Sequence, residues 1–326
     1  MAGEYLSLST AGEVIASTLS HRAQRGSLVD NLTNHTALLQ ALTRKARPFT
    51  GGNLIIEHLE YAFNESFTWT RGYDEVPIQP NQAFRTAEFD LKEANIAVTI
   101  SQRELMMNTG REQVFSLLKN RIRNARSTFN DRMAQACYYT GAEFGGKAIG
   151  GMQLLVSDTG GGTVGGIEAS TTAGNGYWKN LVESLPDSNE VLSASSISRR
   201  MSRAITRTAR NRDRTNFIVT TRELWTEFER SMQAQQRQAS SRSADLGFPS
   251  LMLHGHPVVF DDYCPKDRMY FLNTDYIRLR PHSRMNMDSI GGARMPINQN
   301  ATVRMVGWMG AMTINNRSRQ LVLKTA

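Results

Sequence analysis

The stretch that decides the fold is 114-VFSLLKNRIRNARSTFNDRMAQACYYTG-141, where apolar side chains recur at steps of three and four. The residues on this spacing are Val114, Leu118, Ile122, Ala125, Phe129, Met133 and Ala136. Because an α-helix repeats every 3.6 residues, the spacing predicts one long helix, opening near Asn108, with a single apolar stripe. The other faces of the helix carry most of its basic residues, including Arg121, Arg123 and Arg126. These arginines either are simply solvated or contact nucleic acid.

Upstream of this helix, the sequence predicts a polar arm and then a long β-hairpin. The arm, 1–50, is rich in Ser and Thr and has one amphipathic stretch, 28–46. Phe67 and Trp69 then alternate with threonines, a polar tip follows at 71–82, and apolar residues return on a period of two that slips phase near Glu93. Because an isolated hairpin is marginally stable in water, we expect it to lie on a neighbouring subunit.

Downstream of the helix, a glycine-rich passage at 145–176 predicts loops with one or two strands, and the pattern then turns α/β. The predicted helices are 193–210 and 222–235, and the predicted strands are 216–220, 250–253, 257–260, 269–272 and 276–279. Strands at 301–314 and 320–323 would form a terminal hairpin about the turn 315–318. The fold class is therefore α+β.

Composition limits the possible functions. The chain has 326 residues, 40% of them hydrophobic and 21% charged, which is typical of a globular protein with two or three lobes. Its net charge of +8 is a modest excess that leaves a nucleic-acid partner and a plain solvated surface equally open. It contains neither a membrane-length apolar run nor a signal-peptide pattern, so we expect a soluble cytosolic protein with Cys137 and Cys264 as free thiols.

Three motifs resemble chemical sites, and each fails on context. Gly160 to Gly165 fits a dinucleotide-binding glycine pattern, but no helix follows to hold the pyrophosphate. The segment Gly141 to Ala148 resembles a phosphate-binding loop, but Ala148 stands where a magnesium-binding hydroxyl is needed. His254 and His256, with Asp261, Asp262 and Cys264 nearby, match no established metal-ligand spacing. We therefore expect no enzyme activity, no cofactor and no metal.

The order of the parts is more informative than any motif. Over essentially the whole chain, this order resembles the HK97-like fold of tailed-phage major capsid proteins. The parts are, in order, an arm, a long hairpin, a spine helix, a glycine-rich passage, an α/β lobe and a terminal β-hairpin. The local matches are 253-LHGHPVVFDD-262, which is similar to the family's Gly-x-Pro-Val strand and acidic turn, the strand-turn-strand 269-MYFLNTDY-276, and the helix end at 139-YTG-141 leading to 149-IGG-151.

The resemblance implies five segments and a structural function. These are an N-terminal arm (1–50), an E-loop hairpin (51–100), a P-domain spine helix and loop (101–174), an A-domain (175–289) and a return to the P-domain with the terminal hairpin (290–326). The family's subunits form hexamers and pentamers that close into an icosahedral head around double-stranded DNA. The implied partners are other copies, a portal protein, a separate scaffolding protein and possibly a decoration protein, in a virion assembled in the host cytoplasm.

The residues that matter for a shell protein are contacts. Phe67, Trp69, Phe84 and Phe89 are the expected intersubunit contacts, since aromatic residues dominate interface hot spots, although some could pack within their own hairpin. The expected DNA-facing residues are Arg121, Arg123 and Arg126.

The sequence departs from some relatives in two ways. The arm begins almost at once, which implies a separate scaffolding protein or a mature form. The hairpin has no lysine before Lys92, so we do not expect the covalent cross-link that some relatives form.

Two other readings stay open. An encapsulin-like nanocompartment shell would share the fold and hold an enzyme cargo, whereas the basic net charge and the absence of a recognisable cargo-docking arm favour a virus. A basic nucleic-acid-binding monomer or dimer would instead show a steep salt dependence of DNA binding by the free subunit.

Overall fold

The computed structural model describes residues 36–76, 78, 82–107, 117–184, 196–211, 213–232 and 251–324. These residues group into two compact units. Unit 1 contains the described parts of Asn95–Phe129 and Ser289–Val306, and unit 2 contains those of Asn34–Ala94, Asn130–Asp288 and Gly307–Ala326. The predicted long helix is confirmed as α4 (Leu117–Ala136), and its expected start near Asn108 lies outside the described residues.

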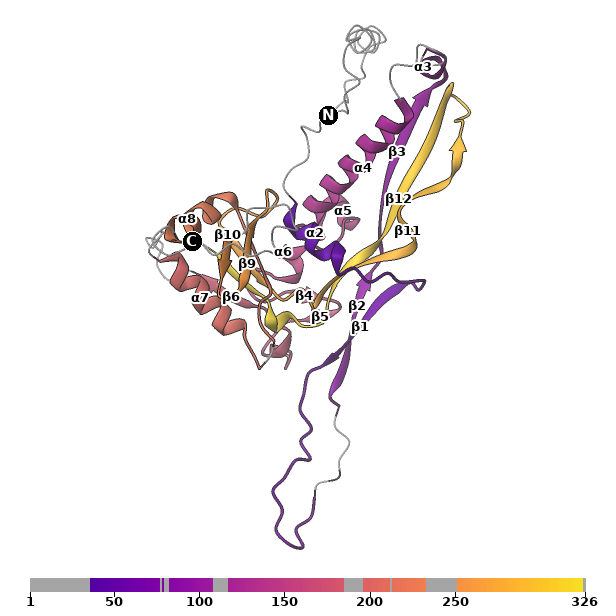
Figure 1. The fold of residues 1–326 in the computed structure, drawn as a ribbon. Helices are drawn as coiled ribbons and strands as arrows, with labels where there is room; N and C mark the ends of the chain where they lie inside the picture. The colour runs from indigo at the N-terminus through magenta and orange to yellow at the C-terminus, as the bar shows by residue number, and fades with distance from the viewer. Residues whose placement is uncertain are drawn as a thin grey trace. The chain divides into compact units, whose positions relative to one another are not determined.

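The core of unit 2 is a six-stranded mixed sheet with the order β6-β13-β10-β7-β9-β8. Its strands are β6 (Leu181–Ser184), β7 (Phe217–Thr220), β8 (Leu251–Leu253), β9 (His256–Phe260), β10 (Arg268–Leu272) and β13 (Leu321–Lys324). Helices α7 (Ile197–Thr208) and α8 (Arg222–Met232) pack their apolar stripes on one face of this sheet (Figure 1). The α/β lobe predicted from the sequence is confirmed.

The predicted terminal hairpin is wrong. β12 (Ala301–Ile314) belongs to a separate sheet of order β11-β12-β3, with β11 (Ile277–Arg294) and β3 (Lys92–Ser101). β13 instead pairs with β10 and β6 in the six-stranded sheet. Leu321, Val322 and Leu323 are all fully buried, because an interior strand is covered on both faces. The predicted strand 276–279 is only the beginning of β11, whose later, polar residues gave no strand pattern.

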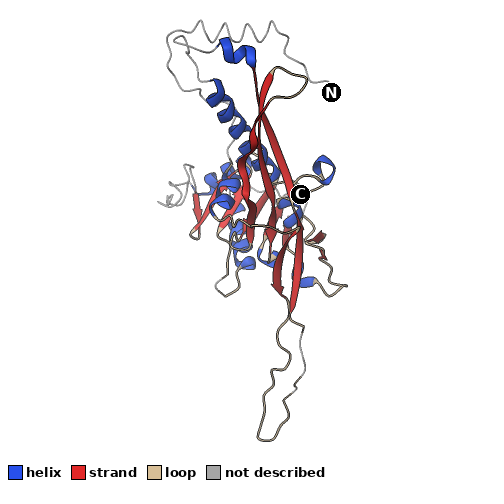
Figure 2. Ribbon diagram, turned by 90° about the vertical axis from the view of Figure 1, so that its right-hand side faces the viewer, coloured by secondary structure: helices blue, strands red, loops and turns tan. Residues whose placement is uncertain are grey.

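The long hairpin exists, but its strands differ from those predicted. β1 (Leu54–Glu60) pairs antiparallel with β2 (Phe84–Asp90), and residues 61–76 between them form no strand. Figure 2 shows that the paired strands stop well short of the end of the hairpin. The strand expected at Phe67 and Trp69 is therefore wrong, because no described residue of the hairpin beyond β1 and β2 forms a strand. The predicted phase slip corresponds to the break at Leu91 between β2 and β3.

Short elements make up the connections. They are α2 (Ala37–Arg44), α3 (Gln102–Met107), α5 (Glu143–Gly146), α6 (Met152–Leu155), β4 (Thr163–Val164), β5 (Ile167–Glu168), η1 (Gly176–Trp178) and η2 (Arg317–Arg319). The glycine-rich passage does contain two short strands, β4 and β5, which pair with each other. None of the helices in the described ranges is long and apolar enough to cross a membrane.

Candidate assembly surface

The hairpin loop, residues 61–76, exposes an unusual number of large apolar side chains. Phe67 is 75% exposed, Trp69 89% and Tyr73 105%, and Phe84 at the start of β2 is 77% exposed. The Phe67 and Trp69 rings meet edge to face with centroids 5.6 Å apart, so they present one joint aromatic surface. Contiguous exposed apolar surface on a folded protein usually marks an interaction site.

The four predicted contact residues do not share one environment. Phe67, Trp69 and Phe84 are exposed, whereas Phe89 is 8% exposed and lies on the inward phase of β2 with Ala87. Phe89 packs within its own subunit and is not available to a neighbour. Two further rings of the loop, Phe63 and Tyr73, were not among the predicted contacts and are 80% and 105% exposed. Their aromatic character between turn-forming polar residues was the available signal.

A buried carboxylate anchors the base of the hairpin. Glu57, on the inward phase of β1, is 7% exposed. Its Oε1 accepts hydrogen bonds from Arg280 Nη1 at 2.9 Å and from the Thr313 hydroxyl at 3.0 Å, and Arg278 Nη1 lies 3.6 Å from Oε2. A buried charge is tolerated only with such partners, so β1 is fixed to β11 and β12 at this point.

The other strand of the hairpin is held by the glycine-rich passage. The Glu88 amide donates to the Gly165 carbonyl at 3.0 Å, and Gly165 has a positive φ of 60°. A methyl group on Gly165 would lie 2.7 Å from the Cβ of Ala87, so only glycine allows this close approach. The Tyr61 and Tyr177 rings stack 5.1 Å apart nearby. The hairpin base is thus part of the rigid structure of unit 2.

The three arginines proposed to face DNA lie on α4 with different surroundings. Arg121 donates from Nη2 to Glu104 Oε1 at 2.7 Å and from Nη1 to the Thr99 carbonyl. Burial raises the pKa of Glu104, but hydrogen bonds from Ser101 and the charge of Arg121 outweigh it and hold that pKa below its usual value. Arg123 and Arg126 are exposed. Arg121 therefore has a structural partner, whereas Arg123 and Arg126 point to solvent.

Two carbonyl groups of the glycine pattern at 160–165 contact a buried arginine. Arg317 is fully buried and donates from Nε to the Leu155 carbonyl at 2.8 Å and from Nη2 to the Gly161 carbonyl at 3.0 Å. Its Nη2 also lies 3.1 Å from Asn180 Oδ1. Burial lowers the pKa of Arg317 to about 10, so it stays charged at neutral pH. The carbonyl groups of the loop turn toward this cation, which is opposite to the arrangement that binds phosphate.

The segment Gly141 to Ala148, which resembles a phosphate-binding loop, contains a carboxylate that binds the amides at its start. Glu143 accepts the backbone amides of Thr140 at 3.0 Å and Gly141 at 2.9 Å, together with the Thr140 hydroxyl. Burial raises the pKa of Glu143, but these hydrogen bonds outweigh it and lower that pKa. Because the amides already bind an anion, this loop has no free amide cradle for a phosphate.

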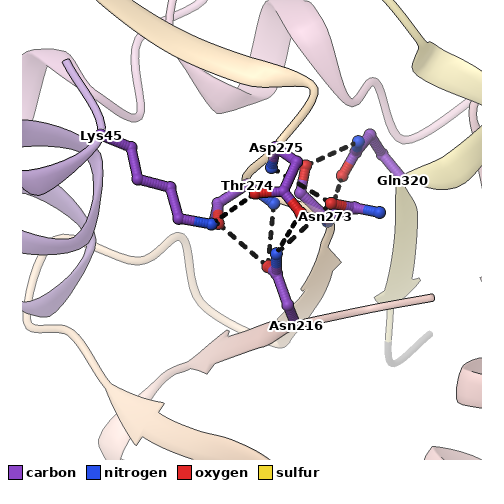
Figure 3. Close-up of polar contacts among 6 residues, drawn as sticks. All are labelled: Lys45, Asn216, Asn273, Thr274, Asp275 and Gln320. Carbon is purple, nitrogen blue, oxygen red and sulfur yellow. Dashed lines mark hydrogen bonds and ion pairs between the residues drawn. The ribbon is translucent and has the colours of Figure 1, made fainter. Parts of the chain in front are cut away.

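A polar network holds the end of α2 against the six-stranded sheet. Figure 3 shows its six members, Lys45, Asn216, Asn273, Thr274, Asp275 and Gln320. Lys45 Nζ lies 2.6 Å from Asp275 Oδ1 and donates to the Thr274 hydroxyl at 2.8 Å. Asn216 accepts the Thr274 amide at 2.9 Å, and Gln320 accepts the Asn273 amide at 2.8 Å. The loop after β10 is therefore a structural junction between α2, β7 and the turn before β13.

The opposite end of α2 is held by a buried acid. Asp261 is 1% exposed, and its carboxylate accepts the backbone amides of Leu38 and Tyr263, each at 3.0 Å. Burial raises the pKa of Asp261 to about 6 despite these hydrogen bonds. Cys137 and Cys264 are buried free thiols, as predicted, and burial raises the pKa of Cys137 to about 12. They are therefore unreactive at neutral pH.

The two histidines at the β8–β9 turn lie in different environments. His254 occupies the turn between β8 and β9 with a φ of 50°, and its Nε2 lies 2.9 Å from the Ser202 hydroxyl. His256 is 7% exposed, and burial lowers its pKa. No group of His, Cys, Asp and Glu side chains within the described part of the chain could hold a metal ion. The polar clusters thus hold elements together and leave the exposed hairpin loop as the candidate site.

Comparison with known proteins identifies the fold. No protein-family model matches the sequence, and no curated protein sequence matches it. Among solved structures, the cyanophage A-1(L) capsid asymmetric unit superposes with a TM-score of 0.71 at 14% identity, covering 94% of this chain and 97% of that one. The capsid of a native GTA particle superposes with a TM-score of 0.61 at 13% identity, with 100% of both chains covered.

The chain has the HK97-like capsid fold. A further structure with this fold is the SrpI encapsulin complex from Synechococcus elongatus PCC 7942, which superposes with a TM-score of 0.58 at 12% identity, covering 95% of this chain and 94% of that one. The HK97-like fold expected from the order of the parts is confirmed over the length of the chain.

Proposed function

We propose that this protein is the major capsid protein of a tailed bacteriophage. Its copies form hexamers and pentamers that close into an icosahedral head around double-stranded DNA. The observation that carries the proposal is the end-to-end match to phage capsid subunits, with TM-scores up to 0.71, combined with a hairpin loop in which Phe67, Trp69 and Tyr73 are each at least 75% exposed. In the shell, the loop lies against a neighbouring subunit and holds the two subunits together.

Several partners belong to the same proposal. Exposed Arg123 and Arg126 contact the packaged DNA non-specifically through its phosphates, with Arg121 as a weaker contributor because Glu104 already pairs with it. A portal protein, a separate scaffolding protein and possibly a decoration protein complete the head. Assembly takes place in the host cytoplasm, and the protein ends in the virion.

Particle assembly tests this function. The protein would be expressed alone and with a candidate scaffold, beside a variant lacking residues 71–82, and examined by electron microscopy and gradient sedimentation. We expect closed shells or capsomer rings from the intact chain and none from the deletion variant, because that variant cannot clamp its neighbour. A subunit that stays monomeric or dimeric under all these conditions contradicts the proposal and favours the nucleic-acid-binding alternative.

An encapsulin-like shell is the second candidate, because the SrpI encapsulin shares the fold. The net charge of +8 favours a nucleic-acid content over an enzyme cargo. Particles isolated from the native source would distinguish the two. Nuclease-protected double-stranded DNA supports the capsid, and a stoichiometric folded protein cargo supports the nanocompartment.

A further inference from the structure

One end of unit 1 is built from helix α3 and the connection between β11 and β12. The backbone amide of Gln102 donates to the Asn300 carbonyl at 3.1 Å, and its side-chain amide donates to the Thr302 hydroxyl at 3.3 Å. Helix α3 therefore begins against the connection, 295–300, and Figure 1 shows both at the same end of the three-stranded sheet. We call this region the sheet end. Its exposed side chains include Arg103, Met107, Arg294, Met295, Ile297 and Arg304.

Three large apolar side chains are exposed at the sheet end. Met107 at the end of α3 and Met295 in the connection are each 60% exposed, and Ile297 is 103% exposed. Methionine is flexible and polarisable, so it adapts to the shape of a bound partner. Exposed apolar side chains that gather in one region mark an interaction site more often than single scattered ones do. The sheet end therefore has the apolar component of a protein-binding surface.

Arginines accompany these apolar side chains. Arg103 and Met107 are four residues apart, so they share one side of α3. Arg294, the last residue of β11, directly precedes the connection. Arg304 is two residues from Thr302 on β12, so it lies on the strand face that meets α3. All three arginines are exposed.

The described part of unit 1 carries far more positive than negative charge. It contains a single acidic residue, Glu104, whose Oε1 lies 2.7 Å from Arg121 Nη2. Its basic residues are Arg103, Lys119, Arg121, Arg123, Arg126, Arg294 and Arg304. The stretches 1–33 and 108–116, outside the described residues, contain three bases and four acids, which lower the balance only from +6 to +5 even if all of them lie beside this unit. The sheet end is therefore suited to a negatively charged partner.

The combination of charge and apolar exposure distinguishes three kinds of partner. A second copy that met the surface through its own sheet end would bring like charges together, which is unfavourable. The phosphates of DNA would neutralise the arginines but leave Met107, Met295 and Ile297 in water. A polypeptide that carries both carboxylates and apolar side chains is complementary to both parts of the surface.

We propose that the sheet end binds an acidic amphipathic segment of a second protein. The carboxylates of this segment pair with the three arginines, and its apolar side chains cover the two methionines and Ile297. The surface uses residues other than Arg123 and Arg126, to which we assign the DNA contacts. The inference does not depend on the capsid function.

Binding of a designed peptide tests the inference. The probe is a fluorescent peptide of leucine and glutamate whose leucines recur at steps of three and four, so that its helix is amphipathic and acidic. A scrambled peptide of the same composition and a fluorescent DNA duplex are the comparisons. We expect the full-length, unassembled subunit to bind the amphipathic peptide at least about tenfold more tightly than the scrambled one, measured by fluorescence anisotropy.

Two variants separate the charged and the apolar parts of the surface. The arginine variant carries Arg103→Gln, Arg294→Gln and Arg304→Gln. The apolar variant carries Met107→Ser, Met295→Ser and Ile297→Ser. We expect each variant to weaken binding of the amphipathic peptide at least about tenfold, whereas the apolar variant binds the DNA duplex like the unchanged chain.

A matched control removes the same charge elsewhere. It carries Arg47→Gln, Arg71→Gln and Arg214→Gln, which lie at exposed positions of unit 2, and it should bind the peptide like the unchanged chain. Thermal melting checks that all three chains are folded, which we expect because every changed side chain is exposed. The comparison of the two peptides uses the unchanged chain and is independent of how the variants fold.

Each alternative partner gives a different result. Equal binding of the amphipathic and scrambled peptides, or a peptide affinity that neither variant changes, overturns the proposal. If only the arginine variant weakens binding, and does so for the peptide and the duplex alike, the sheet end is a nucleic-acid surface. If the peptide does not bind and the apolar variant prevents self-association of the subunit, the partner is a second copy. Shell assembly by the unchanged chain is measured separately, so the capsid function stands or fails on its own.

Discussion

Asp261 shows how one residue links stability to pH. Its pKa in the folded protein is about 6, above the usual value of 3.8, because burial opposes its charge. Between these two values the folded state binds more protons than the unfolded state, so the free energy of unfolding falls as pH rises through this window. This pKa difference corresponds to about 3 kcal/mol in the free energy of unfolding, and all of that stabilisation is lost above the folded pKa.

Replacing Asp261 tests this linkage. In Asp261→Asn the side-chain oxygen can still accept a backbone amide, and no charge is buried, so we expect the decrease in stability between about pH 4 and 6 to disappear. Urea unfolding of the unassembled subunit across this range would measure it. Asp90→Asn is the matched control, because the Asp90 side chain is 73% exposed and should leave the slope unchanged. An unchanged slope in Asp261→Asn would contradict the assignment.

At the scale of an element, the hairpin depends on its base. β1 and β2 pair over seven residues each, and Glu57 and Gly165 fix them to the rest of unit 2. Beyond that base, the loop exposes its aromatic side chains and carries the intersubunit function that we propose. The packed base of the hairpin sets the position of the loop. The exposed apolar side chains of the loop are available to bind a partner.

Two adjacent glycines allow the cost of backbone strain to be measured apart from the cost of a clash with Ala87. Gly165→Ala and Gly166→Ala both place a side chain at positive φ, which costs about 1–2 kcal/mol. Only at Gly165 does the added methyl meet Ala87, whereas the space at Gly166 is open. We therefore expect Gly165→Ala to cost about 1–3 kcal/mol more and to increase hydrogen exchange of β1 and β2 amides. Equal effects of the two substitutions would argue against the close approach.

At the scale of the whole molecule, the last strand completes the central sheet. β13 lies between β6 and β10, and its Leu321, Val322 and Leu323 are fully buried. The sheet therefore joins residues near 180, 270 and 320, and unit 2 cannot close its core until Leu321–Lys324 are in place. This contact order predicts late, cooperative folding of the lobe.

Truncation tests the role of β13. A chain ending after Gln320 loses the strand, so β6 has no neighbour in the sheet and the apolar cluster under α7 and α8 is opened. We expect loss of the cooperative thermal transition, measured by circular dichroism and calorimetry. A control chain ending after Lys324 retains the whole strand and should melt like the full protein. A normal transition in the shorter chain would show that β13 is dispensable.

Elements with local periodicity were predictable from the sequence. The stripe that includes Ala125, Phe129 and Met133 predicted α4, and the short apolar runs around Val219 and Val259 predicted strands, because these patterns reflect burial of neighbouring residues. The order of these elements was sufficient to indicate the HK97-like fold. Phe67, Trp69 and Phe84 were named from their residue type and are exposed, although the strand assigned to the first two was wrong. Their role as intersubunit contacts stays a prediction.

The sequence by itself determined the long helices α4, α7 and α8, most strands of the α/β lobe and their order, because each rests on the pattern of adjacent residues. Only the tertiary structure decided which strands pair, which placed β13 beside β10 and not beside β12. It also decided that Phe89 is buried and that Arg317 donates to the carbonyl groups of Gly161 and Leu155. These depend on residues distant in sequence, and local patterns do not specify the partner of a strand or of a buried charge.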